Sequence, residues 1–361
     1  ATVIFSSGST GNPKGVMLSH RNVLANVEGI AEVYEMTDDD RMMGVLPLFH
    51  SFGFTGSIWL PLLIGFGVVY HPNPLDGGTI GEMVQKYRAT IVISTPSFCL
   101  GYARKCSVEQ FATLRHVVVG AEKLREPIAR LFKQKYGLDL MEGYGCTEMA
   151  PVVAVNAPDS PAGGRKTSKP GTVGRPLPGV TARVVDRDTG QPVAHGTEGL
   201  LLVTGPNVML GYLNAPELTR EVLRDGWYVT GDIGTIDEDG FVRLTDRLSR
   251  FSKIAGEMVP HLKIEETISQ ILGDSPCVVT AIPDESKGER LVALYTSKDA
   301  SRDTLWSRLS ESSLPRMWIP KRDNLYYVEG IPLLGTGKVD LRKVRELALE
   351  MAGGGVRVPH A

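Results

Sequence analysis

The segment "SSGSTGNPKG" (residues 6–15) has the composition of a loop that binds phosphate. Small residues let backbone N–H groups approach anionic oxygen atoms, the Ser and Thr hydroxyls add donors, and the glycines permit left-handed turns. A Walker A loop needs Gly directly before its Lys and Ser or Thr directly after it, whereas Pro13 and Gly15 flank Lys14. The segment therefore predicts a phosphate site of another class, and the alternative is a mobile Gly/Ser loop on the surface.

The order of the residues in this segment resembles the signature loop of the adenylate-forming superfamily. This superfamily includes acyl-CoA synthetases, firefly luciferase and the adenylation domains of peptide synthetases. Further segments resemble its other motifs in the right order and at suitable distances: "LPLFHSFGF" (46–54), "VGAEKL" (119–124), "EGYGCTE" (142–148), "WYVTGDIG" (227–234), "TDRLSRFSKIAGEMV" (245–259) and "PLLGTGKVD" (332–340). The resemblance covers almost the whole chain, from residue 2 to about residue 347.

The resemblance implies ATP and Mg²⁺ as cofactors and assigns residues to them. Tyr144 would stack on the adenine, Thr147 would bond the α-phosphate, and Glu148 would hold Mg²⁺, a hard cation that carboxylate and phosphate oxygens suit. Asp232 would accept hydrogen bonds from both ribose hydroxyls, because a carboxylate offers two acceptor oxygens. The alternative for Glu148 is a helix-start residue after a capping Thr. The nucleotide-binding set is Ser6, Ser7, Gly8, Ser9, Thr10, Gly11, Lys14, Gly120, Ala121, Glu122, Tyr144, Gly145, Thr147, Asp232 and Arg247.

The resemblance also implies a catalytic lysine and a hinge. Lys338 would lie between an attacking carboxylate and the α-phosphate, where an ammonium group offsets the repulsion of two anions. No general base is needed, because a carboxylate is already a nucleophile at neutral pH. The alternative for Lys338 is a solvated loop lysine. Ser249 occupies the hinge position at which the family commonly has Asp or Lys, and Lys253 and Gly256 would lie near a thiol tunnel.

The apolar segment around "LPLFHSFGF" indicates which class of acid the protein activates. The resemblance makes His50 a gate residue of the acyl site, and the alternative is a hydrogen-bonded core histidine. No acidic residue lies between Arg41 and Asp76, so this segment offers no carboxylate to the amino group of an amino acid. A fatty acid is therefore favoured over an amino acid, and a small aryl acid remains an alternative.

Several segments carry a closer match within the superfamily, namely "RFSKIAGEMV", "PLLGTGKVD", "HVVVGAEKL" and "EGYGCTEMAPVVAVN". They resemble the acyl-acyl-carrier-protein synthetase domain of bifunctional bacterial 2-acylglycerophosphoethanolamine acyltransferases. This resemblance implies a long-chain fatty acid and a phosphopantetheine thiol, with acyl carrier protein as the acceptor. It also implies a cytoplasmic protein, at the inner face of the plasma membrane if a membrane-associated region precedes it. The alternatives are a long-chain or aryl acyl-CoA ligase that uses CoA and a non-catalytic nucleotide-binding module.

The elements that must position these residues follow from the pattern of apolar residues. Strand-like and helix-like segments alternate up to about residue 156, which predicts an α/β fold with a mostly parallel sheet covered by helices. Short strands separated by turn residues then predict a small β-rich subdomain. The expected architecture is the adenylate-forming fold, with an incomplete AMP-binding domain over residues 1–247 that begins at the phosphate loop, a mobile α+β domain over 248–350 and a tail over 351–361.

The bulk composition excludes some classes of protein. The 361 residues include 42% hydrophobic residues, as in ordinary globular proteins, and the formal net charge of −2 gives no reason to expect nucleic acid as a partner. The four cysteines form no CxxC pair and are expected to be reduced. The uncharged stretch from Phe49 to Leu75 is interrupted by Gly and Pro, which favours a buried helix and a buried strand over a membrane span. Because the chain starts directly with a strand-like "TVIF", it is interpreted as a fragment.

Overall fold

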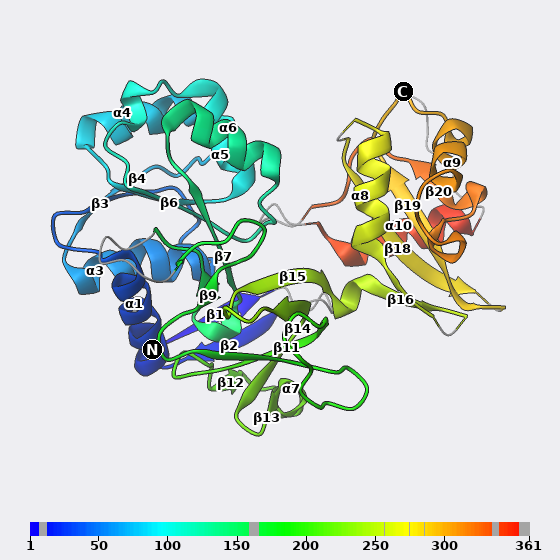
Figure 1. Cartoon of the computed structure of the whole chain (residues 1–361), viewed down its shortest axis with the longest axis horizontal. Coiled ribbons are helices and arrows are strands. Elements are labelled where there is room, and N and C mark those ends of the chain that lie inside the picture. The colour runs from blue at the N-terminus through cyan, green and yellow to red at the C-terminus, as the bar shows by residue number, and fades with distance from the viewer. Residues whose placement is uncertain are drawn as a thin grey trace. The chain divides into compact units, whose positions relative to one another are not determined.

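The computed structural model describes residues 1–6, 13–158, 166–255, 257–273, 275–284, 286–333 and 339–353. These residues form two compact units, the first made of residues 1–6 and 13–245 and the second beginning at Asp246. Figure 1 shows the helices and strands of both units along the chain. The boundary between two domains that the sequence predicts, after residue 247, stays a prediction.

The first unit is built around a seven-stranded sheet. Its first five strands, in spatial order, are parallel, and the last two are antiparallel to their neighbours. The spatial order of the strands is β4 (Gly67–Tyr70), β3 (Arg41–Gly44), β5 (Ile91–Ser94), β6 (His116–Val119), β7 (Leu140–Gly145), β8 (Val152–Val155) and β9 (Arg175–Pro176). This is the mostly parallel sheet that the alternating pattern predicts.

Helices cover both faces of this sheet (Figure 1). Successive side chains of a strand point to opposite faces, so Met42 packs with α1 whereas Met43 packs with the helices of the other face. The helices are α1 (His20–Tyr34) and α3 (Leu60–Ile64) on one face, and α4 (Gly77–Tyr87), α5 (Pro96–Lys105) and α6 (Glu126–Tyr136) on the other. Both faces of the central strands are therefore apolar, as a doubly covered parallel sheet requires.

Two smaller antiparallel sheets complete the first unit. One contains β1 (Thr2–Ser6), β2 (Lys14–Leu18) and β12 (Gly211–Tyr212), in the order β1-β2-β12. The other contains β10 (Thr181–Val185), β11 (Gly199–Thr204), β14 (Trp227–Ile236) and β13 (Leu223–Arg224), with β15 (Val242–Arg247) paired to β14. Helix α7 (Pro216–Val222) lies between β12 and β13 in the chain.

The uncharged stretch from Phe49 forms short α2 (Ser51–Gly53), the π-helix η1 (Phe54–Trp59), helix α3 and strand β4. The Tyr70 hydroxyl of β4 donates to the Ser57 carbonyl oxygen of η1 at 2.6 Å. The expectation of a buried strand is wrong, because β4 is the edge strand of the sheet and Tyr70 is exposed. Within the described residues, no helix combines the length and the apolarity needed to cross a bilayer.

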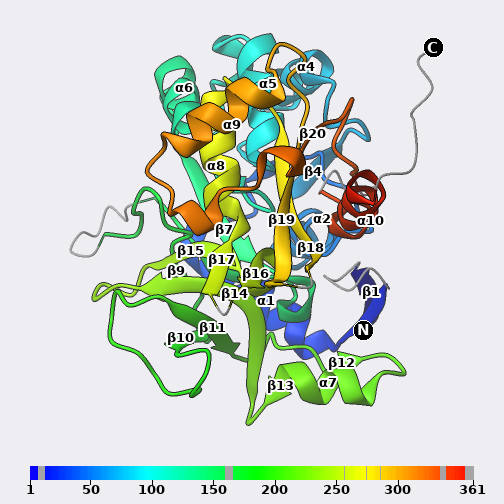
Figure 2. The ribbon, with the colours of Figure 1, turned by 90° about the vertical axis from the view of Figure 1, so that its right-hand side faces the viewer.

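The second unit has a two-stranded sheet of β16 (Phe251–Ile254) and β17 (Glu257–Pro260) and a separate three-stranded sheet. Figure 2 shows helices on both sides of the latter, α8 and α9 on one and α10 on the other. Val279 packs with α8 and α9, whereas its neighbour Val278 packs with α10. The three-stranded sheet is β18 (Cys277–Asp284), β19 (Gly288–Tyr295) and β20 (Leu325–Tyr327), and the helices are α8 (His261–Ile271), α9 (Arg302–Ser310) and α10 (Leu341–Ala352).

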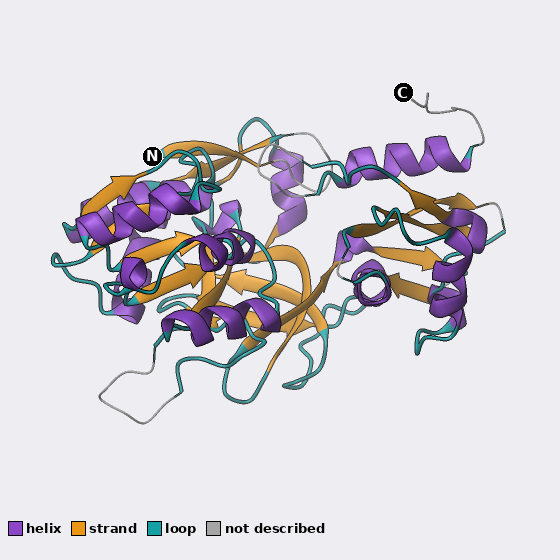
Figure 3. Cartoon of the chain, turned by 90° about the horizontal axis from the view of Figure 1, so that it is seen from above, coloured by secondary structure: helices purple, strands orange, loops and turns teal. Residues whose placement is uncertain are grey.

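Figure 3 distinguishes helices from strands by colour and shows that both units mix the two. The four cysteines are free, two of them buried and two partly buried, and no disulfide joins them. Both units are therefore held together by apolar packing and by backbone hydrogen bonds.

Candidate nucleotide-binding site

The predicted phosphate loop connects the two strands of a β-hairpin. Ser6, the last residue of β1, pairs with Lys14, the first residue of β2. Residues 7–12 between them, which include Ser7, Gly8, Ser9, Thr10 and Gly11, lie outside the described residues. The Ser6 Oγ atom is buried and has no hydrogen-bond partner within the described part of the chain. The hairpin therefore fixes where the loop starts and ends.

Lys14 and Glu148, which are far apart in the sequence, both contact the side chain of Tyr212. The Lys14 Nζ atom lies 5.2 Å from the centroid of the Tyr212 ring, a distance at which a cation is attracted to an aromatic face. The Tyr212 hydroxyl donates to the Glu148 Oε1 atom at 2.8 Å. Both Tyr212 and Glu148 are buried. The predicted phosphate-binding lysine and the predicted Mg²⁺ ligand are thus brought together through one side chain.

Thr147 and Glu148 belong to a single turn that follows β7. This turn is the 3-10 helix η3 (Thr147–Met149), and Cys146 rather than Thr147 occupies its cap position. Thr147 is therefore not the cap that the alternative interpretation expects, but Glu148 does lie in the first turn of this short helix. The Thr147 Oγ1 atom lies 3.2 Å from the Ser51 Oγ atom of α2, so the "EGYGCTE" and "LPLFHSFGF" segments meet at this point.

His50 stands at the start of α2. Its Nδ1 atom accepts a hydrogen bond from the Phe52 backbone N–H at 3.2 Å, so the ring caps the helix. The side chain is only partly buried, which excludes the core histidine of the alternative interpretation. A cap fixes the position of the ring next to the segment that carries Ser51 and Phe52.

Tyr144 and Asp232 form a buried pair. The Tyr144 hydroxyl, on β7, donates to the Asp232 carboxylate, on β14. The exposed fractions are only 9% for Tyr144 and 3% for Asp232, so the carboxylate requires such a donor. The predicted adenine-stacking residue and the predicted ribose-binding residue are therefore adjacent.

The "VGAEKL" segment passes close to the same motif. A Cβ atom on Gly120 would lie 3.3 Å from both the Phe52 ring and the Gly143 carbonyl oxygen, so the backbone runs tightly there. Ala121 follows with a left-handed φ of 68°. Glu122 is exposed, and its carboxylate accepts from the Ser97 hydroxyl at 2.5 Å.

Two residues of the "EGYGCTE" segment have structural tasks. A Cβ atom on Gly145 would lie 2.3 Å from the Pro151 carbonyl oxygen, so only glycine fits at this position. Glu142, which sequence reasoning did not assign, accepts from the Leu124 backbone N–H at 2.9 Å and ties β7 to the "VGAEKL" segment. Burial raises the pKa of Glu142 above its usual range.

Residues 1–213 match the family model described as "AMP-binding enzyme". The chain belongs to this family. It is 30% identical to a long-chain-fatty-acid–CoA ligase of Bacillus subtilis (strain 168) over 96% of its own residues, and it spans 61% of that protein's length. It is 32% identical to a feruloyl-CoA synthase of Amycolatopsis sp, with 95% of the chain and 69% of the relative covered.

The solved structures give the same family. The crystal structure of ATP-bound MatB from Rhodopseudomonas palustris has a TM-score of 0.83 and is 29% identical, covering 96% of this chain and 67% of that one. The predicted resemblance to the adenylate-forming superfamily and the predicted fold are confirmed. The chain spans about three fifths of the length of the first relative named above.

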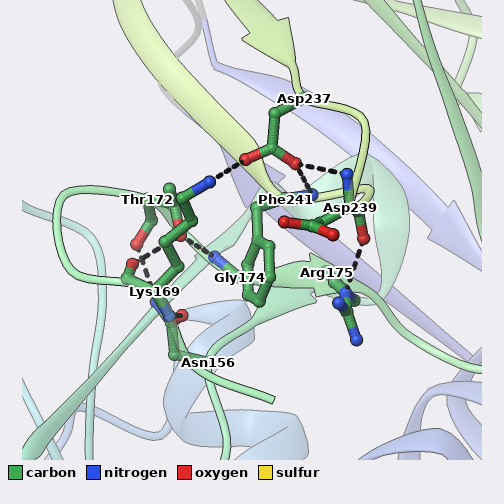
Figure 4. A network of polar contacts seen from close by, with 8 residues as sticks. All are labelled: Asn156, Lys169, Thr172, Gly174, Arg175, Asp237, Asp239 and Phe241. Carbon is green, nitrogen blue, oxygen red and sulfur yellow. Dashed lines mark hydrogen bonds and ion pairs between the residues drawn. The ribbon is translucent and has the colours of Figure 1, made fainter. Parts of the chain in front are cut away.

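A polar network holds the part of this AMP-binding family member that carries Asp232 (Figure 4). Asp237, at the turn between β14 and β15, accepts from the Lys169 Nζ atom at 2.6 Å and from the Phe241 backbone N–H at 2.9 Å. The Arg175 guanidinium stacks on the buried Phe241 ring, 4.4 Å from its centroid. The turn between β14 and β15 is thereby held through two of its residues, Asp237 and Phe241.

The same network reaches the strand that carries Tyr144. The Lys169 backbone N–H donates to Asn156 at 2.9 Å, and the Asn156 side chain donates to the Thr172 carbonyl oxygen at 2.7 Å (Figure 4). The Asn156 side chain also donates to the Glu142 carbonyl oxygen at 3.1 Å. The hairpin of β14 and β15 is thus linked to β7. Sequence reasoning missed this network, because the polar loop that contains Lys169 gives no sign of which turn it contacts.

The remaining predicted site residues belong to the second unit or lie outside the described residues. Arg247 and Lys253 are exposed and belong to the second unit. Lys338, Gly256 and the side chain of Ser249 lie outside the described residues. The site described above therefore contains the predicted residues of the first unit only.

The residues present fit a Mg²⁺ ion that is shared with phosphate. Among the described residues, no group of three or more His, Cys, Asp or Glu side chains is arranged to hold a metal. Mg²⁺ commonly binds through one or two carboxylates together with substrate phosphates and water, and Glu148 offers one buried carboxylate near Lys14. Tyr212, which completes this arrangement, was not found from the sequence.

Proposed function

We propose that this chain activates a carboxylic acid with ATP and transfers the acyl group to a phosphopantetheine thiol. The observation that carries the proposal is the chain of contacts from Lys14 through Tyr212 to Glu148. It joins the end of the predicted phosphate loop to the predicted metal ligand, as a triphosphate site requires. Membership of the AMP-binding enzyme family supports the same reaction.

The first step would join the acid to AMP. A carboxylate oxygen attacks the α-phosphorus of ATP, and pyrophosphate leaves with the electrons of the broken P–O bond. Glu148 would hold Mg²⁺, which supplies positive charge to the phosphates when it is bound. Thr147 would donate to the α-phosphate, and Lys338 would offset the charge that develops between the two anions. Positioning and charge compensation are the tasks left to the protein.

The second step would release AMP. The thiol sulfur attacks the acyl carbon, the mixed anhydride bond breaks toward AMP, and the thiol proton passes to solvent. We propose that residues 248–350 move as a domain between the two steps, because one cleft must present Lys338 first and a thiol tunnel near Lys253 and Gly256 afterwards. Ser249 would lie at the pivot, and residues 351–361 would form a tail outside it.

The acid is proposed to be a long-chain fatty acid. The apolar segment from Phe49 to Leu75 and the similarity to a long-chain-fatty-acid–CoA ligase support this substrate. A second candidate is an aryl acid, favoured by the comparable identity to a feruloyl-CoA synthase. Initial rates with palmitate and with ferulate, each at several concentrations, separate the two by their kcat/KM values.

The acceptor is proposed to be acyl carrier protein, and CoA is the alternative. The relatives named above are CoA ligases, which favours CoA. Acyl carrier protein, and a coupled phospholipid acyltransferase at a membrane, are favoured by the four segments with the closer match, "RFSKIAGEMV", "PLLGTGKVD", "HVVVGAEKL" and "EGYGCTEMAPVVAVN". Turnover of the protein with CoA and with holo acyl carrier protein at equal thiol concentration distinguishes the acceptors. A tenfold or greater preference for either thiol, about 1.4 kcal/mol, would assign it.

The role of Lys338 gives the sharpest test of the reaction. We expect Lys338→Ala to abolish acid-dependent exchange of labelled pyrophosphate into ATP while leaving transfer from preformed acyl-AMP to the thiol largely intact. Lys298→Ala, at an exposed surface lysine of the second unit, is the control and should change neither reaction. Equal loss of both half-reactions in Lys338→Ala would contradict the assignment. Nucleotide binding without any pyrophosphate release in the wild type would instead indicate a non-catalytic binding module.

A further inference from the structure

We infer that Tyr212 is a positioning residue that orients the Glu148 carboxylate for the metal and couples it to the phosphate loop. The inference rests on the proposed function, because Glu148 is the proposed Mg²⁺ ligand. Tyr212 belongs to none of the segments in which the sequence predicts site residues, and it lies 64 positions from Glu148 in the chain. Its role follows from three kinds of contact.

The first contact is the hydrogen bond to the carboxylate. The Tyr212 hydroxyl lies 2.8 Å from the Glu148 Oε1 atom, and both residues are buried, with exposed fractions of 4% and 8%. Within the described residues, Tyr212 is the one side chain that donates to this carboxylate. A donor on one oxygen stops the carboxylate from rotating and leaves the other oxygen for a cation, as groups behind metal ligands commonly do.

The second contact is made by the backbone around Tyr212. On one side, Tyr212 pairs with Val16 of β2, and the Leu213 N–H donates to the Gly15 carbonyl oxygen at 2.7 Å. On the other side, the Met209 N–H donates to the Glu148 carbonyl oxygen at 2.8 Å. One short segment, residues 209–213, is therefore bonded both to the strand that follows the phosphate loop and to the turn that carries Glu148.

The third contact is the face of the Tyr212 ring, over which the Lys14 ammonium lies. The hydroxyl of the same ring donates to the Glu148 carboxylate. The hydroxyl and the ring therefore have separable tasks. The hydroxyl holds the carboxylate and the ring holds the lysine, so Tyr212→Phe removes the first task and keeps the second.

The experiment measures binding of a non-hydrolysable ATP analogue by calorimetry, once with excess Mg²⁺ and once in chelator, and binding of Mn²⁺ to the analogue complex by electron paramagnetic resonance. We expect Tyr212→Phe to bind the ATP analogue in chelator with an affinity within about twofold of that of the wild type. The same variant should bind Mn²⁺ about tenfold or more weakly than the wild type does. Tyr212→Leu also removes the aromatic ring that contacts Lys14, so it should weaken both the binding of the analogue in chelator and the binding of Mn²⁺. Tyr34→Phe is the control, because it removes another buried hydroxyl that donates to a carbonyl oxygen of Asn156.

A double-mutant cycle with Glu148→Gln shows whether Tyr212 acts through Glu148. If it does, adding Tyr212→Phe to Glu148→Gln causes no further loss of Mn²⁺ binding. Unchanged Mn²⁺ binding in Tyr212→Phe, additive losses in the cycle, or an equal loss of binding in chelator would each overturn the inference. A wild type that binds the analogue but shows no metal dependence would overturn it as well. A wild type that binds no nucleotide at all would overturn the proposed function, and with it the inference.

Discussion

Asp232 shows at the level of one residue how the proposed ribose site is kept in shape. Its carboxylate is almost completely buried and accepts from the Tyr144 hydroxyl, and its own backbone N–H donates to the Thr230 hydroxyl at 3.0 Å. A buried carboxylate without donors would be costly, so the pair stabilises the site when no ribose is bound. A carboxylate offers two acceptor oxygens, which suits the proposed contact with the ribose hydroxyls.

Replacing Asp232 by alanine tests this role. We expect the KM for ATP to rise ten- to a hundredfold, because buried hydrogen bonds to a charged acceptor contribute about 1.5–3 kcal/mol each. The preference for ATP over dideoxy-ATP should disappear in the variant, since no acceptor for the ribose hydroxyls remains. Pyrophosphate exchange at varied nucleotide concentration measures both effects.

Asp188→Ala, at an exposed turn of the same unit, is the control for this substitution and should leave both quantities unchanged. An Asp232→Ala variant that still discriminates between the two nucleotides would place the ribose elsewhere.

At the scale of elements, the β14–β15 hairpin depends on a glycine next to β8. Gly174 has a left-handed φ of 86°, and a Cβ atom there would lie 1.9 Å from the Val155 carbonyl carbon. Its backbone carbonyl accepts from the Val242 N–H at 2.8 Å, and its N–H donates to the Thr172 hydroxyl at 3.2 Å. The close approach of two backbones at this point connects the hairpin of Asp232 to the main sheet.

Gly174→Ala is therefore expected to destabilise the first unit. The left-handed conformation alone costs about 1–2 kcal/mol for alanine, and the overlap with Val155 should bring the loss in free energy of unfolding to about 3 kcal/mol or more. Gly190→Ala is the matched control, since Gly190 has a φ of 70° but no atom within 4 Å of the added Cβ. Urea unfolding curves of both variants provide the comparison, and equal losses would show that the Val155 contact relaxes at little cost.

The elements that sequence reasoning identified are those with a strong local pattern. The spacing of Val23, Val27, Ile30 and Val33 predicts a helix over residues 20–34, and α1 forms there with the Ser19 side chain as its cap. Of these four residues the first three are buried and Val33 is partly buried. Strand β4 was misjudged because an apolar run does not reveal whether a strand lies at the edge of a sheet. Short strands such as β12 were missed because two residues have no periodicity to detect.

The residues of the candidate site likewise divide into those that a local sequence pattern reveals and those that it does not. Glu148, Asp232 and the phosphate loop are named by motifs that are contiguous in the sequence. Tyr212 and Lys169 act through partners more than sixty positions away, so nothing near them in the sequence indicates their contacts. Contiguous motifs therefore reveal the groups that would contact a nucleotide, whereas the groups that hold them in place require the three-dimensional structure.

At the scale of the whole molecule, a buried histidine makes the stability of the second unit depend on pH. In the second unit, burial lowers the pKa of His261 to about 3, with the Arg250 guanidinium as a further cause, and its Nε2 atom lies 2.6 Å from the Ser252 hydroxyl. An unfolded His has a pKa of about 6.5, so the unfolded chain binds the proton more readily between these values. The stability that neutral His261 provides is thus present above pH 6.5 and is lost as the pH falls toward 3.

Hydrogen–deuterium exchange of peptides from α8 and β18 between pH 7 and pH 4.5 tests this prediction, after correction for the intrinsic exchange rate. Protection should fall with pH in the wild type and fall less steeply in His261→Gln, whose amide can still bond Ser252. His195→Gln, at an exposed histidine of the first unit, should behave like the wild type. An unchanged slope in His261→Gln would assign the acid sensitivity of the second unit to other groups, of which the buried Arg250–Glu265 ion pair is the nearest.

The hydrogen bond from Tyr70 to the Ser57 carbonyl oxygen attaches the π-helix to an edge strand rather than to the centre of the sheet. An edge strand has one neighbour, so it can shift without breaking a second ladder of backbone bonds. This contact lies at the periphery of the sheet, with three strands between β4 and β7, the strand that carries Tyr144. Under the proposed function, a protein built this way can change the acid it accepts over evolutionary time while its proposed nucleotide site stays the same.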